Sequence, residues 1–259
     1  MTRRSGAIPF GRLLAEFAVI VIGVLVALLT ESWWQERGER REEREALVRI
    51  HDEIVADSLR LQRTGLWLDF VIPAADRVPE ILTGRDTLPL TGQLALLYAA
   101  ATVNQTGYLF WTWDELRETG RTGLIRDPEV RASLVRYFAA SADLEEGRNG
   151  LPDTSRAMTV GLMPSAFANR ILNRCLRAEA VPDAGPREDA LAGLEACTER
   201  PGVDPATLLA RLRGQDGLAI EAGRLAYELT QLRGNLSLMR AQRDSTLAVL
   251  EARRSGGAP

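Results

Sequence analysis

The sequence contains no lysine: all 32 of its Lys+Arg residues are arginine, and its 259 residues include one histidine and two cysteines. Schiff-base enzymes, phosphate-loop nucleotidases and kinases each need a lysine, so the sequence excludes these classes. Most zinc, haem and iron–sulfur sites need more histidine and cysteine than this chain has. We therefore expect no enzyme activity, no metal and no cofactor.

Strand signals are scarce as well. No run of residues alternates between apolar and polar for long, and the one Asn-Gly pair, Asn149-Gly150, has no such run on either side. Hydrophobic residues make up 46% of the chain and charged residues 26%, which is typical of a folded protein. The net charge of −3 gives no indication of nucleic acid binding. The composition predicts a folded, all-α protein.

The longest apolar run extends from Leu13 to Trp34. Its uncharged core, Phe17 to Thr30, is too short to span a bilayer, but the full run makes a helix of about 33 Å, close to the thickness of the hydrocarbon core. Trp33 and Trp34 then lie at the membrane interface, where aromatic side chains are enriched. A cleaved signal peptide is the alternative, but no small-residue cleavage site follows the run. We expect a retained transmembrane helix in the lipid bilayer.

Arginines lie on both sides of this run, so the positive-inside rule does not decide its orientation. The arginines after it alternate with glutamates, and pairs such as Glu36 with Arg40 and Glu45 with Arg49 have helical i,i+4 spacing. A short tail before a first span usually stays in the cytoplasm. We expect a single-pass protein of the bacterial inner membrane with a cytoplasmic N-terminus and a periplasmic domain.

Glu16 is the unusual residue of the membrane run. Its side chain either reaches the interface beside Arg12, one turn earlier, or contacts a polar group on another membrane helix, because intramembrane carboxylates are costly and usually functional. Gly23 and Ala27 form a small-x-x-x-small pair that allows close helix approach. These three residues are the predicted membrane-helix contact, and integral-membrane proteins are the expected partners.

The helical pattern continues beyond the membrane without a break over residues 35–64. An apolar seam runs along it, with Asp57 in a position that breaks the spacing, through Leu47, Ile50, Ile54 and Leu61. Pro73 and Pro79 predict that the next segment is confined to short pieces.

The sequence predicts short helices in the middle of the chain. Thr112 and Glu115 form a capping-box pattern, Gly120 is a helix stop, and Asp127-Pro128 is a helix start. A helix over residues 153–178 should bend or split at Pro164.

The best-patterned segment is the last one, where apolar residues alternate by four and three through Leu218, Ala222, Leu225, Leu229, Leu232, Leu236 and Met239. Its natural partner is the seam of the first long helix. We therefore predict a helical bundle whose long first and last helices are antiparallel. The expected boundaries are a tail over 1–12, a membrane helix over 13–34, a stalk and first bundle helix over 35–64, a helical domain over 65–254 and a flexible tail over 255–259.

Few residues outside the membrane run indicate a site. Cys175 and Cys197 lie in the expected periplasmic domain, so a disulfide is favoured, with two free thiols as the alternative. The single histidine, His51, is interpreted as a flank residue of a charged helix. The aromatic cluster is either core or a partner surface, because Trp and Tyr are common at binding hot spots; its members are Tyr108, Phe110, Trp111 and Trp113.

The first 140 residues resemble a family of uncharacterised bacterial single-span membrane proteins. The resemblance rests on the membrane helix with Glu16, IGVLVAL and Trp33-Trp34, on HDEIVADSLRL (His51–Leu61) and on WDELRETGRTGLIRDPEVRASLVRYF (Trp113–Phe138). It implies a location and an architecture but no activity.

Three functions follow from these observations. The first is a non-catalytic, membrane-anchored scaffold or accessory subunit of a larger membrane complex, of the kind found in respiratory and photosynthetic complexes. The second is a helical sensor or ligand-binding module that signals through a partner. An enzyme with a carboxylate-based site is the least favoured.

Overall fold

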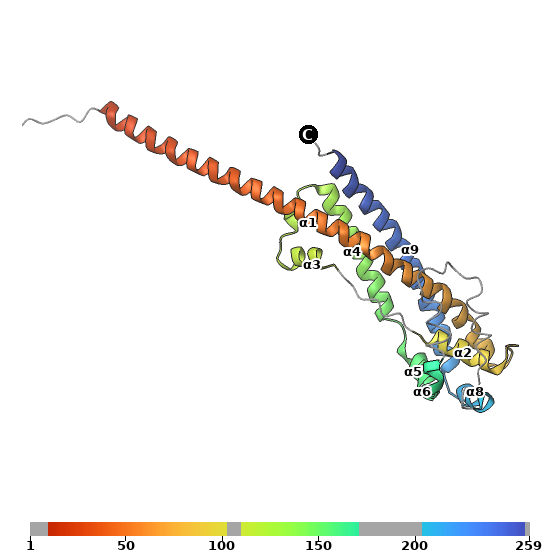
Figure 1. The fold of residues 1–259 in the computed structure, drawn as a ribbon. Coiled ribbons are helices and arrows are strands. Elements are labelled where there is room, and N and C mark those ends of the chain that lie inside the picture. The colour runs from red at the N-terminus through yellow and green to blue at the C-terminus, as the bar shows by residue number, and fades with distance from the viewer. Residues whose placement is uncertain (1–9, 103–109, 171–203, 257–259) are drawn as a thin grey trace, which may run out of the picture. The chain divides into compact units, whose positions relative to one another are not determined.

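The structure is a computed structural model that describes residues 10–102, 110–170 and 204–256 (Figure 1). Every regular element in this part of the chain is a helix, which confirms the predicted all-α class. The contacts divide the chain into two units. Unit 1 comprises Met1–Ile50 and Trp111–Asp127, and unit 2 comprises His51–Phe110 and Pro128–Pro259.

Helix α1 (Phe10–Leu82) is 73 residues long and belongs to both units. It confirms the predicted helix beyond the apolar run, but it does not stop at Pro73 or Pro79, so the prediction of short pieces was wrong. Each proline removes one backbone hydrogen bond. The helix nevertheless continues because one face of this segment is packed, with at most 3% exposure at Leu68, Val71, Ala75, Val78 and Ile81.

Unit 2 is built on three long helices: the second part of α1, α4 (Pro128–Asn149) and α9 (Leu218–Gly256). Helix α9 runs antiparallel to α1, as predicted. Arg240 Nη2 donates to the Leu61 carbonyl at 3.0 Å, and Arg233 Nη2 lies 2.7 Å from Asp69 Oδ1. The predicted seam of α9 is buried from Leu218 to Met239, with at most 7% exposure at each of its seven residues.

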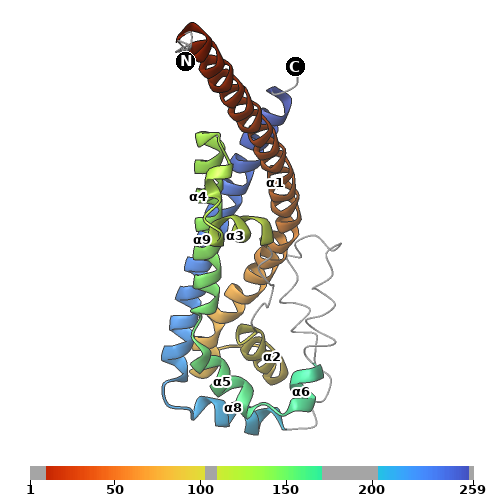
Figure 2. The ribbon, with the colours of Figure 1, turned by 90° about the vertical axis from the view of Figure 1, so that its left-hand side faces the viewer.

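Helix α4 is a second partner of α9, which the sequence analysis did not predict. The two helices are also antiparallel, and Figure 2 shows them side by side. Thr246, which interrupts the apolar seam of α9, is fully buried, and its hydroxyl lies 2.9 Å from that of Ser133 on α4. Helix α4 begins at Pro128, as its sequence predicts.

In the described part of unit 2, four short helices lie at one end (Figure 2): α2 (Leu90–Ala100), α5 (Asp153–Leu162), α6 (Ser165–Arg170) and α8 (Pro205–Arg213). The predicted split at Pro164 separates α5 from α6. Asp204 caps α8 by accepting from the Thr207 amide at 3.0 Å. The Thr207 hydroxyl also donates to Asp204, and this bond, followed by the amide bond, lowers the pKa of the Asp204 carboxyl. Arg213 Nε ties α8 to α1 by donating to the Ile81 carbonyl at 2.9 Å.

Unit 1 contains α3 (Trp111–Glu118) and the 3₁₀ turn η1 (Thr122–Leu124). Gly120 has a φ of 68° and ends α3, which confirms the predicted stop. The capping-box prediction was wrong, because α3 starts before Thr112 and this residue is buried within the helix.

Candidate functional site

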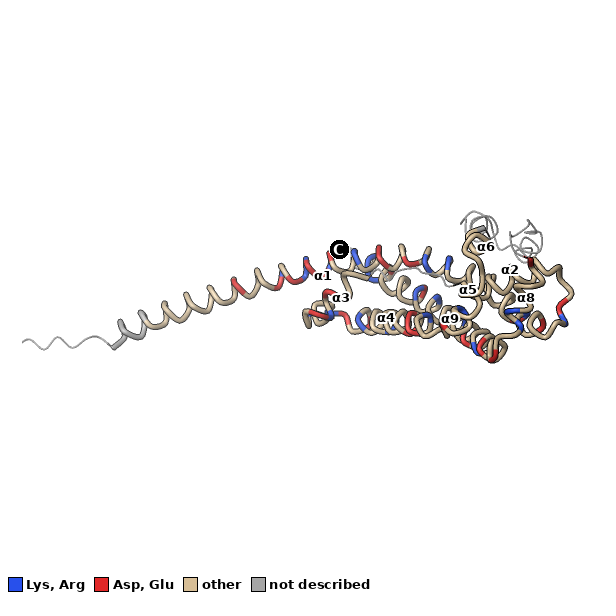
Figure 3. Tube along the Cα trace, turned by 90° about the horizontal axis from the view of Figure 1, so that it is seen from below, with Lys and Arg blue, Asp and Glu red and all other residues tan. Residues whose placement is uncertain are grey.

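The N-terminal part of α1 is long and apolar enough to cross a membrane. It contains an 18-residue window with a mean hydropathy of 2.0, none of which is buried. Beyond the grey residues at its start, α1 is drawn in tan in Figure 3, without Lys, Arg, Asp or Glu, until shortly before the charged stalk. Gly23 and Ala27 are exposed there, and a Cβ added at Gly23 would meet nothing within 4 Å. The predicted helix-contact face is therefore open. Glu16 lies within α1, but its side chain is outside the described residues.

Two tryptophans mark the end of the apolar run. Trp33 and Trp34 are exposed, and their rings meet edge to face at 5.8 Å. The guanidinium of Arg37 lies 4.2 Å from the centre of the Trp33 ring, which is a cation–π distance. Amphipathic rings beside a cation are typical of a membrane interface.

Charged residues of α1 then hold the segment that precedes α4, within unit 1. Arg126 contributes most of these contacts: its Nη2 lies 2.8 Å from Glu39, its Nη1 lies 3.5 Å from Glu36, and its amide donates to Glu43 at 2.7 Å. Arg121 pairs with Glu42. We call these six residues the stalk clasp. Its side chains are exposed, so each ion pair contributes little to stability.

Along the stalk itself, one of the two predicted pairs is present. Arg40 donates to Glu36 at 2.6 Å, and this bond, followed by the charges of Arg40 and Arg126, lowers the pKa of Glu36. Glu45 instead accepts from Arg41, one turn earlier, at 2.9 Å.

The second charged site lies inside unit 2, between α1 and α4. Arg60 is central to it. Its Nη1 donates to Glu145 at 2.7 Å, its Nη2 donates to Ser141 at 3.3 Å, and its Nε donates to Asp57, one helical turn earlier. The Tyr137 hydroxyl donates to the second oxygen of Asp57 at 2.8 Å, and Arg148 pairs with Glu145. We call these six residues the ion network.

The ion network is electrically balanced, and its centre is buried while Glu145 and Arg148 at its edge are half-buried. Asp57 is 7% exposed, Arg60 is 9% exposed, and Tyr137 is fully buried. Burial lowers the pKa of Arg60, but the hydrogen bond and charge of Asp57 outweigh that effect, so the net pKa is raised and the guanidinium keeps its charge. Burial, followed by the Asp57 charge, raises the pKa of Tyr137, which stays a neutral donor. The two guanidiniums of the network therefore balance its two carboxylates, and the Tyr137 hydroxyl donates to one of these carboxylates.

The predicted aromatic cluster divides between core and surface. Phe110 is 2% exposed and meets Tyr137 and Phe138 edge to face, at 5.6 and 5.1 Å. Trp113 is buried as well, which leaves Trp111, at 75% exposure, for the predicted partner surface. Tyr108 lies outside the described residues. Phe110 thus packs against the ring of Tyr137, whose hydroxyl belongs to the ion network.

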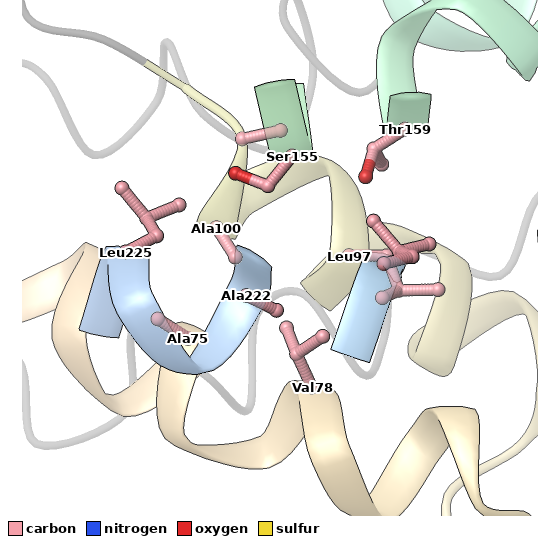
Figure 4. A pocket seen from close by; sticks show the side chains of 10 residues that line it. Ala75, Val78, Leu97, Ala100, Ser155, Thr159, Ala222 and Leu225 are labelled. Carbon is pink, nitrogen blue, oxygen red and sulfur yellow. The ribbon is translucent and has the colours of Figure 1, made fainter. Parts of the chain in front are cut away.

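A small cavity lies in unit 2, where α1, α2, α5 and α9 meet (Figure 4). Its walls are mainly alanine, leucine and valine, and Ser155 and Thr159 of α5 face it. The Ser155 hydroxyl is buried and has no hydrogen-bond partner among the described residues. The free volume is about 10 Å³, near the minimum for one water molecule. This cavity is therefore far smaller than a typical ligand pocket.

One member of the ion network, Asp57, was apparent from the sequence, but only as a defect of the apolar seam. The missed signal was a polar stripe on α4, at spacings of four, four and three, formed by Tyr137, Ser141, Glu145 and Arg148. Asp57 and Arg60, one turn apart on α1, match this stripe. The pairing of α1 with α4 was needed to see the match.

No protein-family model, curated protein or solved structure matches this chain. The resemblance to single-span bacterial membrane proteins stays a prediction. Cys175 and Cys197 lie outside the described residues, so the predicted disulfide also stays a prediction. Among the described residues, no group of three or more His, Cys, Asp and Glu side chains is placed to hold a metal ion.

Proposed function

We propose that this chain is a non-catalytic scaffold or accessory subunit of a larger bacterial membrane complex, such as a respiratory or photosynthetic one. The observation that carries the proposal is the continuity of α1. One helix joins an exposed apolar segment to the packed core of unit 2 without a break at residues 35–64. Such a helix would connect a folded domain to a segment long enough to cross the bilayer.

The exposure of the apolar segment supports a membrane anchor. A core helix of a soluble protein buries its apolar side chains, whereas Phe17, Ile20 and Leu29 are 66%, 64% and 67% exposed. Lipid would cover this surface on all sides. Trp33, Trp34 and Arg37 would then lie at the interface, with the stalk clasp in the adjacent water.

We place the anchor in the inner membrane, with the N-terminus in the cytoplasm and the helical domain in the periplasm. Protease added to spheroplasts should then digest the domain. Full protection of the domain would reverse this orientation. A disulfide between Cys175 and Cys197 depends on the same orientation, and non-reducing mass mapping of protein from membranes should detect it.

The function is tested by purifying the full chain from native membranes in a mild detergent and identifying what comigrates. A stoichiometric set of integral-membrane proteins is the expected result, and their identity names the complex. Replacing Glu16 with Leu should weaken that assembly if Glu16 contacts another membrane helix. The matched variant Glu31→Leu, which removes the carboxylate at the other end of the run, controls for changes in membrane insertion. A chain that migrates without partners would contradict the scaffold.

A sensor that signals through a partner is the second function, and one observation favours it. Asp57 and Arg60 of the ion network lie on α1, the same helix that carries the proposed membrane segment. A shift of α4 against α1 would therefore displace groups on that helix. Limited proteolysis with and without periplasmic small molecules tests this function. A ligand that protects the α4 region would support it.

A further inference from the structure

Helix α5 buries polar side chains and exposes an apolar one. Its two buried residues are Ser155 and Thr159, each 4% exposed, whereas Val160 is 36% exposed. The two hydroxyl residues are one helical turn apart, so their side chains lie on the same face of α5. A short helix usually packs on a core through apolar side chains. The reversed pattern in α5 indicates that this contact involves a polar group.

The surface that α5 meets across the small cavity is apolar. Figure 4 shows Ser155 and Thr159 on one side of the cavity and Val78 of α1 and Ala222 of α9 on the other. The side chains of Val78 and Ala222 cannot form hydrogen bonds. The Ser155 hydroxyl is buried, and no group in the described part of the chain bonds to it. Folded proteins rarely leave a buried hydroxyl without a partner.

The end of α2 brings hydrogen-bond acceptors to the same cavity. An α-helix leaves its last four carbonyls without a helical partner. In α2, the amides of Ala101 and Thr102 donate to the carbonyls of Tyr98 and Ala99, at 3.1 and 3.0 Å. The other two carbonyls of this turn belong to Leu97 and Ala100, and both residues line the cavity.

We propose that this cavity binds one buried water molecule, which joins the hydroxyls of Ser155 and Thr159 to the last turn of α2. The free volume of about 10 Å³ accommodates one water and nothing larger. None of the described residues that line the cavity is charged, so the site suits a neutral molecule rather than an ion. A buried water needs two to four polar partners, and the two hydroxyls with a carbonyl of α2 supply three.

The water would attach α5 to the rest of unit 2. Helix α5 has only 10 residues, and Pro152 at its N-terminus forms no side-chain capping bond. A helix this short is not stable alone in water, so it depends on its contacts with the rest of the protein. The hydroxyl face is the buried part of that contact. Loss of the water should therefore loosen α5 before it affects the long helices.

The test is hydrogen–deuterium exchange of the full chain in detergent micelles, measured by mass spectrometry on peptides from α5. In Ser155→Ala, the α5 amides should exchange about 5 to 30 times faster than in the wild-type chain. Alanine is a better helix former than serine, so helix propensity would act in the opposite direction. Thr154→Ala, at the exposed neighbouring residue, is the matched control and should not accelerate exchange. Unchanged exchange in α9 would show that the bundle stays folded.

Exchange in Ser155→Ala that is equal to or slower than in the wild-type chain would overturn the proposal. Removing an unpartnered hydroxyl from a dry cavity stabilises the contact, so a dry cavity predicts that result. Thr159→Val keeps the shape of the side chain and removes the second hydroxyl, and it should also accelerate exchange. If both hydroxyls hold the same water, the double variant should exchange no faster than the faster single variant. Effects of the two changes that multiply would contradict a shared water.

Discussion

Helix α1 carries two sets of ion pairs that use the same residue types in opposite surroundings. In unit 1, the stalk clasp joins Glu39 and Glu42 to Arg126 and Arg121 in solvent. In unit 2, the ion network joins Asp57 to Arg60 at no more than 9% exposure. An exposed pair contributes little to folding stability, because water solvates the separated charges almost as well as the pair stabilises them. Burying an ion pair costs desolvation free energy, and removing only one partner destabilises the fold strongly, because the other charge stays buried. The comparison predicts that similar substitutions have very different effects at the two sites.

The largest effect is expected from Arg60→Leu. This change leaves the buried carboxylate of Asp57 without its cation and leaves the half-buried Glu145 with Arg148 alone, which should destabilise the chain by about 3 to 5 kcal/mol. Urea-induced unfolding of the full chain in micelles, followed by circular dichroism, measures the loss. Arg126→Leu makes the same chemical change in the stalk clasp and should cost about 1 kcal/mol or less. Equal losses for the two variants would remove the distinction between the sites.

The next effect sharpens the comparison within the ion network. Tyr137→Phe keeps the ring contact with Phe110 but removes the hydroxyl that donates to Asp57 at 2.8 Å. A hydrogen bond to a charged group is worth about 1.5 to 3 kcal/mol. Unfolding should show a loss in that range. The control is Tyr227→Phe, whose side chain is on the exposed face of α9, and it should leave the free energy of unfolding unchanged.

The sequence was sufficient to predict the helices and the antiparallel α1 and α9, because these depend on the apolar spacing within each segment, and the stop at Gly120, because glycine readily adopts a positive φ. It was not sufficient at Pro73 and Pro79, where the burial of residues such as Val78 outweighs the lost hydrogen bonds. The capping box at Thr112 failed for a similar reason, since that residue is buried inside the helix.

The candidate sites divide in the same way. The apolar segment of α1 could be predicted from one continuous run, because hydropathy is a local property. The ion network could not, because Asp57 and Glu145 are far apart in sequence and each has ordinary surroundings by itself. A polar residue in an apolar seam is a useful signal only when a matching polar stripe is found on another helix. Asp57 had such a match in Tyr137, Ser141 and Glu145.

A smaller effect is expected where α4 meets α9. The hydroxyls of Ser133 and Thr246 lie 2.9 Å apart and both are buried. Ser133→Ala or Thr246→Val alone leaves one buried hydroxyl with a weaker partner and should cost about 1 to 2 kcal/mol. The double variant should cost less than the sum of the two, because both polar groups are gone. Strict additivity in this double-mutant cycle would mean that the two hydroxyls do not interact.

The smallest effect concerns the pH dependence of the stalk. Arg40 lowers the pKa of Glu36 by a hydrogen bond and by its charge, and Arg126 adds to this. The folded chain therefore binds the Glu36 proton less readily than the unfolded chain does. This contribution to stability is complete above the ordinary pKa of 4.5 and is lost as the pH falls through the lower, folded value. Thermal melts of the full chain across this range should show a weaker pH dependence for Glu36→Gln than for the wild-type chain. Glu118→Gln, at an exposed carboxylate of α3, should leave the dependence as it is. High salt should reduce the difference, because it screens exposed charges, and a difference that persists in salt would contradict the exposed character of the stalk clasp.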